Sequence, residues 1–120
     1  MHVVHLEDDS PLSEVLKIAL TATEPRINLK QFTNSDAAMA YIEEHLEEID
    51  LYVLDIRVPG QLNGLEVAQQ VRERGGSGAI VLTSAYTKPD QSFLNDSKVE
   101  WMPKPWHILD VPSKLFSLVK

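Results

Sequence analysis

The chain contains no cysteine, which excludes disulfide bonds, thiolate metal sites and thiol nucleophiles. It has no apolar run near the ~20 residues that a membrane-spanning helix needs, and no basic segment followed by an apolar one that would indicate a secretion signal. Acidic residues outnumber basic ones by 18 to 11, for a net charge of −7, and clusters of lysine and arginine are missing. Because phosphate backbones are neutralised by clustered positive charge, direct contact with nucleic acid is not expected. We expect a cytoplasmic protein with no role in a membrane.

The sequence instead alternates short apolar segments with amphipathic ones. Continuous apolar runs predict buried strands, whereas apolar residues spaced by three and four predict one face of a helix. The predicted strands cover residues 2–6, 27–32, 51–55, 79–82 and 100–102. Helices are predicted from Pro11 with Ser10 as the N-cap, from near Ser35, over 65–71, weakly within 87–97, and over 111–119.

This alternation predicts an α/β fold in which right-handed crossovers build one parallel sheet with helices on both faces. The 120 residues are 43% hydrophobic and 24% charged, with no internal repeat or linker, so we expect a single doubly wound (βα)₅ domain over residues 1–120. Ligands of such sheets bind at the carboxyl ends of the strands, which is where functional residues are to be sought.

Polar and charged side chains follow four of the predicted strands: Glu7, Asp8, Asp9, Asp55, Ser84 and Lys104. The topology brings these strand ends to one edge of the sheet. Carboxylates that lie close together repel one another unless a cation or a raised pKa relieves them, and carboxylate oxygens suit Mg²⁺. A lysine supplies a point charge for phosphate oxygens and a serine a hydroxyl donor. The set therefore indicates phosphorylation of a carboxylate nucleophile.

Four segments resemble, in order, the signatures of response regulator receiver domains: Glu7-Asp8-Asp9-Ser10-Pro11, Asp55-Ile56-Arg57-Val58-Pro59 with Gly64, Thr83-Ser84-Ala85, and Lys104-Pro105. The resemblance covers essentially the whole chain. It implies a flavodoxin-like domain whose five strands are arranged in the order 2-1-3-4-5.

The resemblance also implies a phosphoacceptor and a metal site. Asp55 matches the phosphoacceptor, and Glu7 and Asp8 match the acidic pair, with Asp8 as the direct ligand of Mg²⁺, for which Mn²⁺ can substitute. The pair can also be read as Asp8 and Asp9; Ser10-Pro11, which opens the first helix, favours the first reading. The backbone carbonyl of Arg57 matches the third ligand.

Further positions match the parts of the family that respond to phosphorylation. Ser84 matches the hydroxyl that bonds the phosphoryl group, and Lys104 matches the ion-pairing lysine, which precedes a cis proline. Trp101 occupies the aromatic switch position, although plain core packing explains a tryptophan there equally well. Trp106 is expected to pack beneath the last helix.

Three features depart from the family pattern. The loop from Asp55 to Gly64 is one residue longer than usual, and Trp101 replaces the usual tyrosine or phenylalanine. The segment after Tyr86 is polar, so we expect a short fourth helix. Arg57 and Tyr86 flank the path of the attacking water in this family, and neither supplies a group that orients water, so we expect slow autodephosphorylation.

The sequence thus predicts a two-component phosphorelay receiver rather than a self-standing enzyme. The resemblance implies that a sensor histidine kinase or phosphotransfer protein donates the phosphoryl group, and that the fourth-helix and last-strand face signals to a downstream protein or output domain. One alternative is a Mg²⁺-dependent phosphohydrolase, but such enzymes carry the nucleophile after the first strand. The other is a degenerate receiver that only docks. The four histidines lack ligand spacing and a recognisable acid–base partner, so we expect no metal or catalytic role for them.

Overall fold

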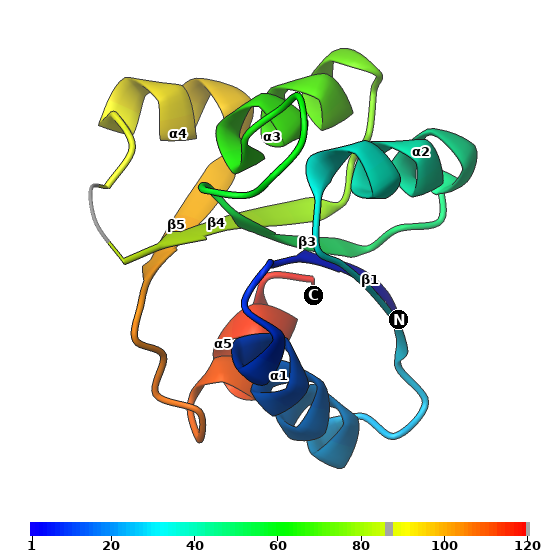
Figure 1. Ribbon diagram of the computed structural model, residues 1–120, viewed down its shortest axis with the longest axis vertical. Coiled ribbons are helices and arrows are strands. Elements are labelled where there is room, and N and C mark those ends of the chain that lie inside the picture. Colours follow the sequence, from blue (N-terminus) through cyan, green and yellow to red (C-terminus); the bar gives the residue numbers. More distant parts are fainter. Residues whose placement is uncertain (86–87, 120) are drawn as a thin grey trace.

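One sheet of five parallel strands runs through the middle of the molecule (Figure 1). A computed structural model of the chain describes residues 1–85 and 88–119. The strands are β1 (His2–Leu6), β2 (Asn28–Phe32), β3 (Leu51–Asp55), β4 (Ala79–Ser84) and β5 (Val99–Pro103). The helices are α1 (Ser10–Thr23), α2 (Ser35–His45), α3 (Gly64–Glu73), α4 (Gln91–Ser97) and α5 (Val111–Ser117). The strand order β2-β1-β3-β4-β5 confirms the predicted α/β fold.

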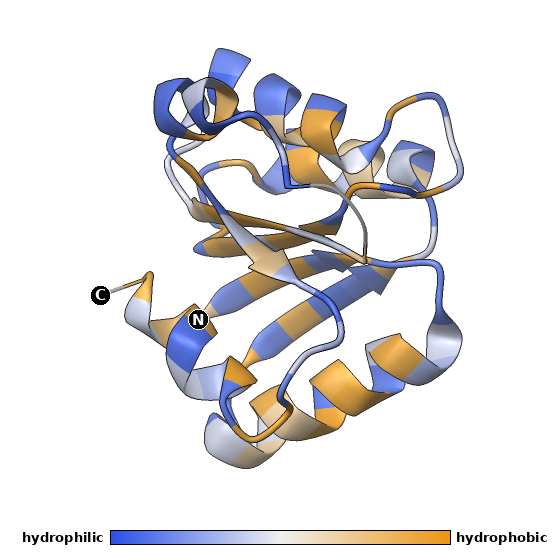
Figure 2. Ribbon diagram, turned by 90° about the vertical axis from the view of Figure 1, so that its left-hand side faces the viewer, coloured by the Kyte–Doolittle hydropathy of each residue, from blue (hydrophilic) through white to orange (hydrophobic). Residues whose placement is uncertain are grey.

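Helices cover both faces of this sheet, with α2, α3 and α4 on one side and α1 and α5 on the other (Figure 1). Because both faces are covered, β3 is buried along its whole length. Figure 2 shows apolar residues on the strands in the middle of the molecule and on the helices that cover them. Side chains of β4 alternate between two hydrophobic cores. Leu82 belongs to the core beneath α2, α3 and α4, called the α2–α4 core, and Val81 belongs to the core beneath α1 and α5, called the α1/α5 core. The next two residues, Thr83 and Ser84, therefore point to opposite faces.

The first helix begins differently from the prediction, in which Ser10 was the N-cap. The N-cap is Asp9, whose carboxylate accepts a hydrogen bond from the Leu12 N–H at 3.1 Å, and Ser10 is already helical. A carboxylate placed one residue earlier reaches the free N–H groups of the first turn and also meets the positive end of the helix dipole. Asp9 is thus engaged with α1.

Several predicted boundaries also shift. Residue 27 lies outside β2 because the Ile27 N–H bonds the Glu24 carbonyl in a turn. Strands β4 and β5 run further than predicted because their ladder continues through the pairs Thr83–Met102 and Ser84–Pro103. Helix α4 is short, as predicted, and its N-cap makes no side-chain hydrogen bond. Among the described residues, no helix has the length and apolar character required to cross a membrane.

Candidate functional site

The register of the sheet brings the ends of four strands to one edge. Leu6 of β1 pairs with Leu54 of β3, so the residues that come next, Glu7 and Asp55, lie side by side. Asp55 in turn pairs with Thr83 on β4. Lys104 directly follows β5, and its N–H donates to the Ser84 carbonyl at 2.9 Å. The predicted site residues at the ends of β1, β3, β4 and β5 are therefore neighbours in the folded chain.

Gly64 allows α3 to begin against the end of β3. Its N–H donates to the Ile56 carbonyl at 2.9 Å. A Cβ on this residue would lie only 2.2 Å from the backbone carbonyl oxygen of Asp55. Any side chain at position 64 would thus push the loop away from Asp55, which explains why the glycine of the motif belongs to the site.

Three carboxylates converge at this edge. Glu7, Asp8 and Asp55 each offer an oxygen, and these oxygens lie within 4.8 Å of one another. Glu7 and Asp55 are buried, with 1% and 6% of their surface exposed, whereas Asp8 is exposed. Asp9 caps α1 and is not part of this cluster. Buried and exposed carboxylate oxygens together form a donor set that fits Mg²⁺, which binds through one or two carboxylates and keeps several waters.

Lys104 balances part of this negative charge. Its ammonium donates to Glu7 Oε1 at 2.6 Å and to Asp55 Oδ2 at 3.1 Å. Burial raises the pKa of Glu7 to about 7, and the hydrogen bond from Lys104 opposes that rise. Burial also disfavours the charged form of Lys104, but its bonds to Glu7 and Asp55 outweigh this and raise its pKa. Lys104 is therefore a stable cation held between two carboxylates.

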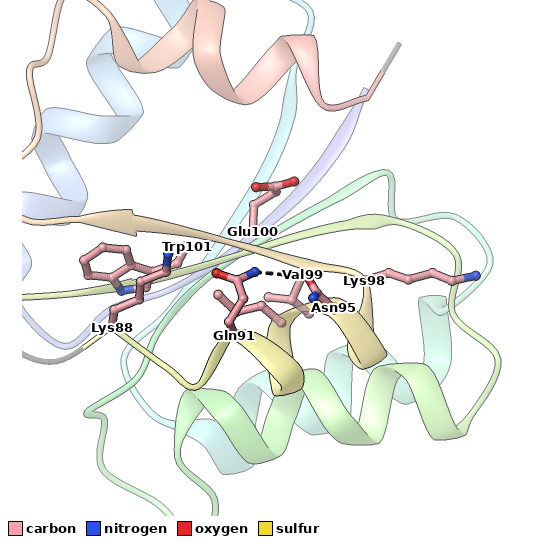
Figure 3. Close-up of a pocket in the computed structure, with 8 residues that line it drawn as sticks. Lys88, Gln91, Asn95, Lys98, Val99, Glu100 and Trp101 are labelled. Atoms are coloured by element: carbon pink, nitrogen blue, oxygen red, sulfur yellow. Dashed lines mark hydrogen bonds between the residues drawn. The ribbon is translucent and has the colours of Figure 1, made fainter.

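Ser84 and Trp101, which the sequence placed in separate segments, are in direct contact. The indole N–H of Trp101 donates to Ser84 Oγ at 3.2 Å. Trp101 is half-buried against the α2–α4 core, and the ammonium of Lys88 lies 6.0 Å from its ring centroid. Figure 3 shows Lys88 beside the indole at one end of a depression along α4 and β5. The hydroxyl of the motif is thus joined to the α4 face.

A second indole–hydroxyl pair was not predicted. The indole N–H of Trp106 donates to Thr83 Oγ1 at 3.1 Å on the α1/α5 face. Trp106 packs against the core beneath α5, as expected. The predicted strand ended at residue 82, so the sequence did not indicate that Thr83 is buried and that its hydroxyl requires a partner.

Other predicted residues contribute less to the described geometry. Arg57 is exposed in the loop after β3, and Tyr86 lies outside the described residues. The Lys104–Pro105 bond is cis, as the resemblance implied. The expectation that the histidines have no acid–base partner is wrong for His45, whose Nδ1 lies 2.6 Å from Glu48 Oε2 because the turn after α2 brings them together.

Comparisons with known proteins agree with this geometry. A family model described as the response regulator receiver domain matches residues 3–111. The chain is 25% identical over 120 residues to the response regulator RppA of Synechocystis sp., an alignment that covers 98% of this chain and 50% of RppA. It is 33% identical over 78 residues to the transcriptional regulatory protein TctD of Salmonella typhimurium, covering 63% of this chain and 34% of TctD. The chain thus spans about half or less of the length of these curated relatives.

Solved structures share the fold of this chain. The signal receiver domain of a LuxO repressor protein from Vibrio parahaemolyticus has a TM-score of 0.85 at 18% identity, over 98% of this chain and 88% of that one. The response regulator protein TrrA from Thermotoga maritima, solved in complex with Mg²⁺-BeF, has a TM-score of 0.78 at 25% identity, over 98% and 97% of the two chains. Since the receiver model covers most of the sequence and the sheet has the expected strand order, the chain belongs to the response regulator receiver domain family.

Proposed function

We propose that the chain, as one receiver unit, accepts a phosphoryl group on Asp55 from a histidine kinase or phosphotransfer protein of a two-component system. The observation that carries this proposal is the meeting of three carboxylates with Lys104 at one edge of the sheet. Asp55 is the member of the group that ends β3, lies mostly buried and faces a cation. A carboxylate oxygen of Asp55 forms the new bond to phosphorus, and the P–N bond of the donor breaks with its electron pair leaving on the histidine nitrogen.

Asp8 and Glu7 hold Mg²⁺ in this proposal, together with Asp55 and the backbone carbonyl of Arg57. When bound, Mg²⁺ neutralises negative charge on the phosphoryl oxygens and on the carboxylates. Asp8 is exposed and lies within reach of the other two carboxylates, which suits a direct ligand. Glu7 is already bonded to Lys104 and to the Asp9 N–H at 3.1 Å, which suits a residue that orients the site.

Lys104 and Ser84 contact the phosphoryl group after transfer. Lys104 already donates to Asp55 Oδ2, so its ammonium needs only a small movement to reach a phosphoryl oxygen. The Ser84 hydroxyl, as it turns toward that group, changes its bond with Trp101. Trp101 then passes the change to the α4 face, which is the signalling surface in this proposal.

The proposed signalling surface contains a depression beside Trp101. A depression of about 410 Å³ lies along α4 and β5 (Figure 3), and its rim includes Lys88, Gln91, Asn95 and Glu100. Because α4 has seven residues and its N-cap makes no side-chain hydrogen bond, we propose that it is the element displaced at this surface. We propose a downstream protein or output domain as the partner of this face, and a cytoplasmic location, where kinase and receiver meet.

Phosphorylation by acetyl phosphate tests the proposal directly. With Mg²⁺ present, intact-protein mass spectrometry should detect one added phosphoryl group on the wild type and none on Asp55→Asn. The matched control is Asp36→Asn, an exposed aspartate in the first turn of α2. An Asp55→Asn variant that is phosphorylated to the same extent as the control would contradict the assignment of Asp55. The phosphorylated wild type should decay slowly, and Arg57→Asn should decay faster if Arg57 shields the group.

A further inference from the structure

The end of β4 is held on both faces of the sheet by tryptophans. Thr83 and Ser84 are consecutive, and each accepts a hydrogen bond from an indole N–H, Thr83 from Trp106 at 3.1 Å and Ser84 from Trp101 at 3.2 Å. Trp101 belongs to the proposed switch, whereas nothing in that mechanism uses Trp106. The pair formed by Thr83 and Trp106 therefore requires its own explanation.

Thr83 is fully buried, at 0% exposed. A valine would fill nearly the same volume at this strand position without a polar atom, and a buried hydroxyl costs free energy unless it is bonded. The hydroxyl is bonded here by an indole from the segment that follows β5. The bond thus ties this segment to the strand that ends beside Asp55.

The tied segment is the one that carries Lys104. The Lys104 N–H donates to the Ser84 carbonyl at 2.9 Å, and two residues later Trp106 bonds the Thr83 side chain. The segment 104–106 is therefore attached at both ends to consecutive residues of β4. The Lys104 ammonium also lies 6.0 Å from the Trp106 ring centroid, within the range of a cation–π interaction.

His5 completes the surroundings of this indole. Its ring centroid lies 6.1 Å from that of Trp106, and the side chain is fully buried on the same face of the sheet. The indole of Trp106 therefore has a buried aromatic neighbour as well as the ammonium of Lys104 beside it.

We propose that Trp106 is a positioning residue for Lys104, which it fixes through its hydrogen bond to Thr83 and through its ring face. The inference rests on the proposed phosphoryl transfer to Asp55, because Lys104 acts there on the phosphoryl oxygens. A lysine has a flexible four-carbon stem, so its ammonium has to be directed if it is to leave one carboxylate and bond a phosphoryl oxygen. An error of about 1 Å in such a contact can cost a large part of its effect.

The test compares two ligands that differ in their need for Lys104. Mg²⁺ alone contacts the carboxylates, whereas beryllofluoride bound with Mg²⁺ stands in for the phosphoryl group and also requires the ammonium. Trp106→Phe keeps an aromatic ring, although a smaller one, and removes the N–H, whereas Thr83→Val keeps the shape and removes the hydroxyl. For each variant we expect beryllofluoride affinity about 5- to 10-fold lower and Mg²⁺ affinity within about twofold of wild type, as measured by calorimetry.

Three further variants separate positioning from general stability. The double variant should be no weaker than either single one, because both remove the same bond. Thr83→Ser restores the acceptor and should bind beryllofluoride like the wild type. Val81→Ala opens a cavity in the same strand and on the same face, away from the hydroxyl, and should leave beryllofluoride affinity unchanged.

The outcomes that overturn the inference are distinct from those that overturn the proposed function. Unchanged beryllofluoride affinity in Trp106→Phe and Thr83→Val would remove the positioning role of Trp106. An equal loss in Val81→Ala, or strictly additive losses in the double variant, would assign the effect to stability and also overturn the inference. A wild type that binds Mg²⁺ but no beryllofluoride would instead contradict phosphoryl acceptance itself.

Discussion

The two tryptophans make matching contacts on opposite faces of the sheet and yet differ in what surrounds them. Each donates its indole N–H to a hydroxyl at the end of β4, and each has a lysine ammonium 6.0 Å from its ring centroid. On the α1/α5 face that lysine is Lys104, which is mostly buried and bonded to two carboxylates. On the α4 face it is Lys88, which is exposed.

The difference teaches that one type of contact can serve two purposes. Trp106 bonds Thr83, which takes no part in the proposed chemistry, so its bond can persist throughout and hold Lys104, the lysine that contacts the phosphoryl group in that proposal. Trp101 bonds Ser84, which is itself drawn to the phosphoryl group in the proposed mechanism, so its bond changes when the group arrives. At the end of β4 we therefore expect the Trp106 side to stay fixed and the Trp101 side to change on phosphorylation.

Among the variants that test the difference between the two faces, removal of Lys104 should have the largest effect on ligand affinity. Lys104→Met leaves Glu7 and Asp55 without their shared cation and removes the group that contacts phosphoryl oxygens in the proposed mechanism. We expect beryllofluoride affinity to fall by about 10- to 100-fold, while Mg²⁺ affinity rises because no ammonium competes for the carboxylates. Calorimetric titration with each ligand measures both changes.

Lys88→Met is the matched control, because it removes the lysine beside the other tryptophan. It should leave both affinities within about twofold of wild type, since an exposed lysine contributes little. If the two lysine variants lost beryllofluoride affinity equally, the distinction between the two faces would be wrong.

The next effect concerns how each tryptophan responds to the ligand. Trp106→Phe leaves Trp101 as the fluorophore, and its emission should change when beryllofluoride and Mg²⁺ are added, because the hydrogen bond to Ser84 changes. Trp101→Phe leaves Trp106, whose emission should change by less than about a third of that amount, because its bond to Thr83 persists. Fluorescence spectra at saturating ligand measure both.

Ser84→Ala in the Trp106→Phe background sharpens this result. It removes the hydroxyl that links Trp101 to the site, so the Trp101 response should be lost while beryllofluoride still binds. A full response in that variant would show that Trp101 senses the ligand by another route.

Much of this site could be predicted from the sequence, but the contacts of the two tryptophans could not. Asp55 and Lys104 each end or follow a strand, and parallel strands bring such residues to one edge, so their meeting was predictable. The indole bonds were not, because they depend on side-chain directions on two faces of β4 and on the path of the segment after β5. The acidic residues fall between these cases, since the spacing left both Glu7–Asp8 and Asp8–Asp9 open.

A smaller effect on stability and on Mg²⁺ affinity is expected from pH, through Glu7 at the edge of the sheet. The pKa of Glu7 is raised from its ordinary value of 4.5 to about 7 by burial. Between these values the folded chain holds a proton that the unfolded chain has released, so the free energy of unfolding should decrease as pH rises from about 4.5 to about 7. Mg²⁺ requires the ionised carboxylate, so its affinity should fall by about tenfold from pH 8 to pH 6.

Calorimetry at pH 6, 7 and 8 measures this dependence. Glu7→Gln, which has no proton to release at this position, should bind Mg²⁺ more weakly at pH 8 and with a flatter pH profile. The same slope in wild type and variant would show that another group sets the dependence. We expect the ionisation of Glu7 to leave the α4 face unaffected. The Trp101 emission of the metal-free protein should therefore stay constant from pH 6 to pH 8.

The smallest expected effect is the loss of a helix cap, and it helps to distinguish the two readings of the acidic pair. Asp9 caps α1 through its bond to the Leu12 N–H and lies outside the carboxylate cluster. Asp9→Ala should therefore lower the free energy of unfolding by about 1 kcal/mol, as measured by urea denaturation, and leave Mg²⁺ affinity unchanged. Asp8→Ala should abolish Mg²⁺ binding and leave the free energy of unfolding nearly unchanged, because Asp8 is exposed but lies within the cluster. Loss of Mg²⁺ binding in Asp9→Ala, with binding retained in Asp8→Ala, would mean that the pair is Asp8–Asp9 and that the capping residue of the α1 face also serves the metal.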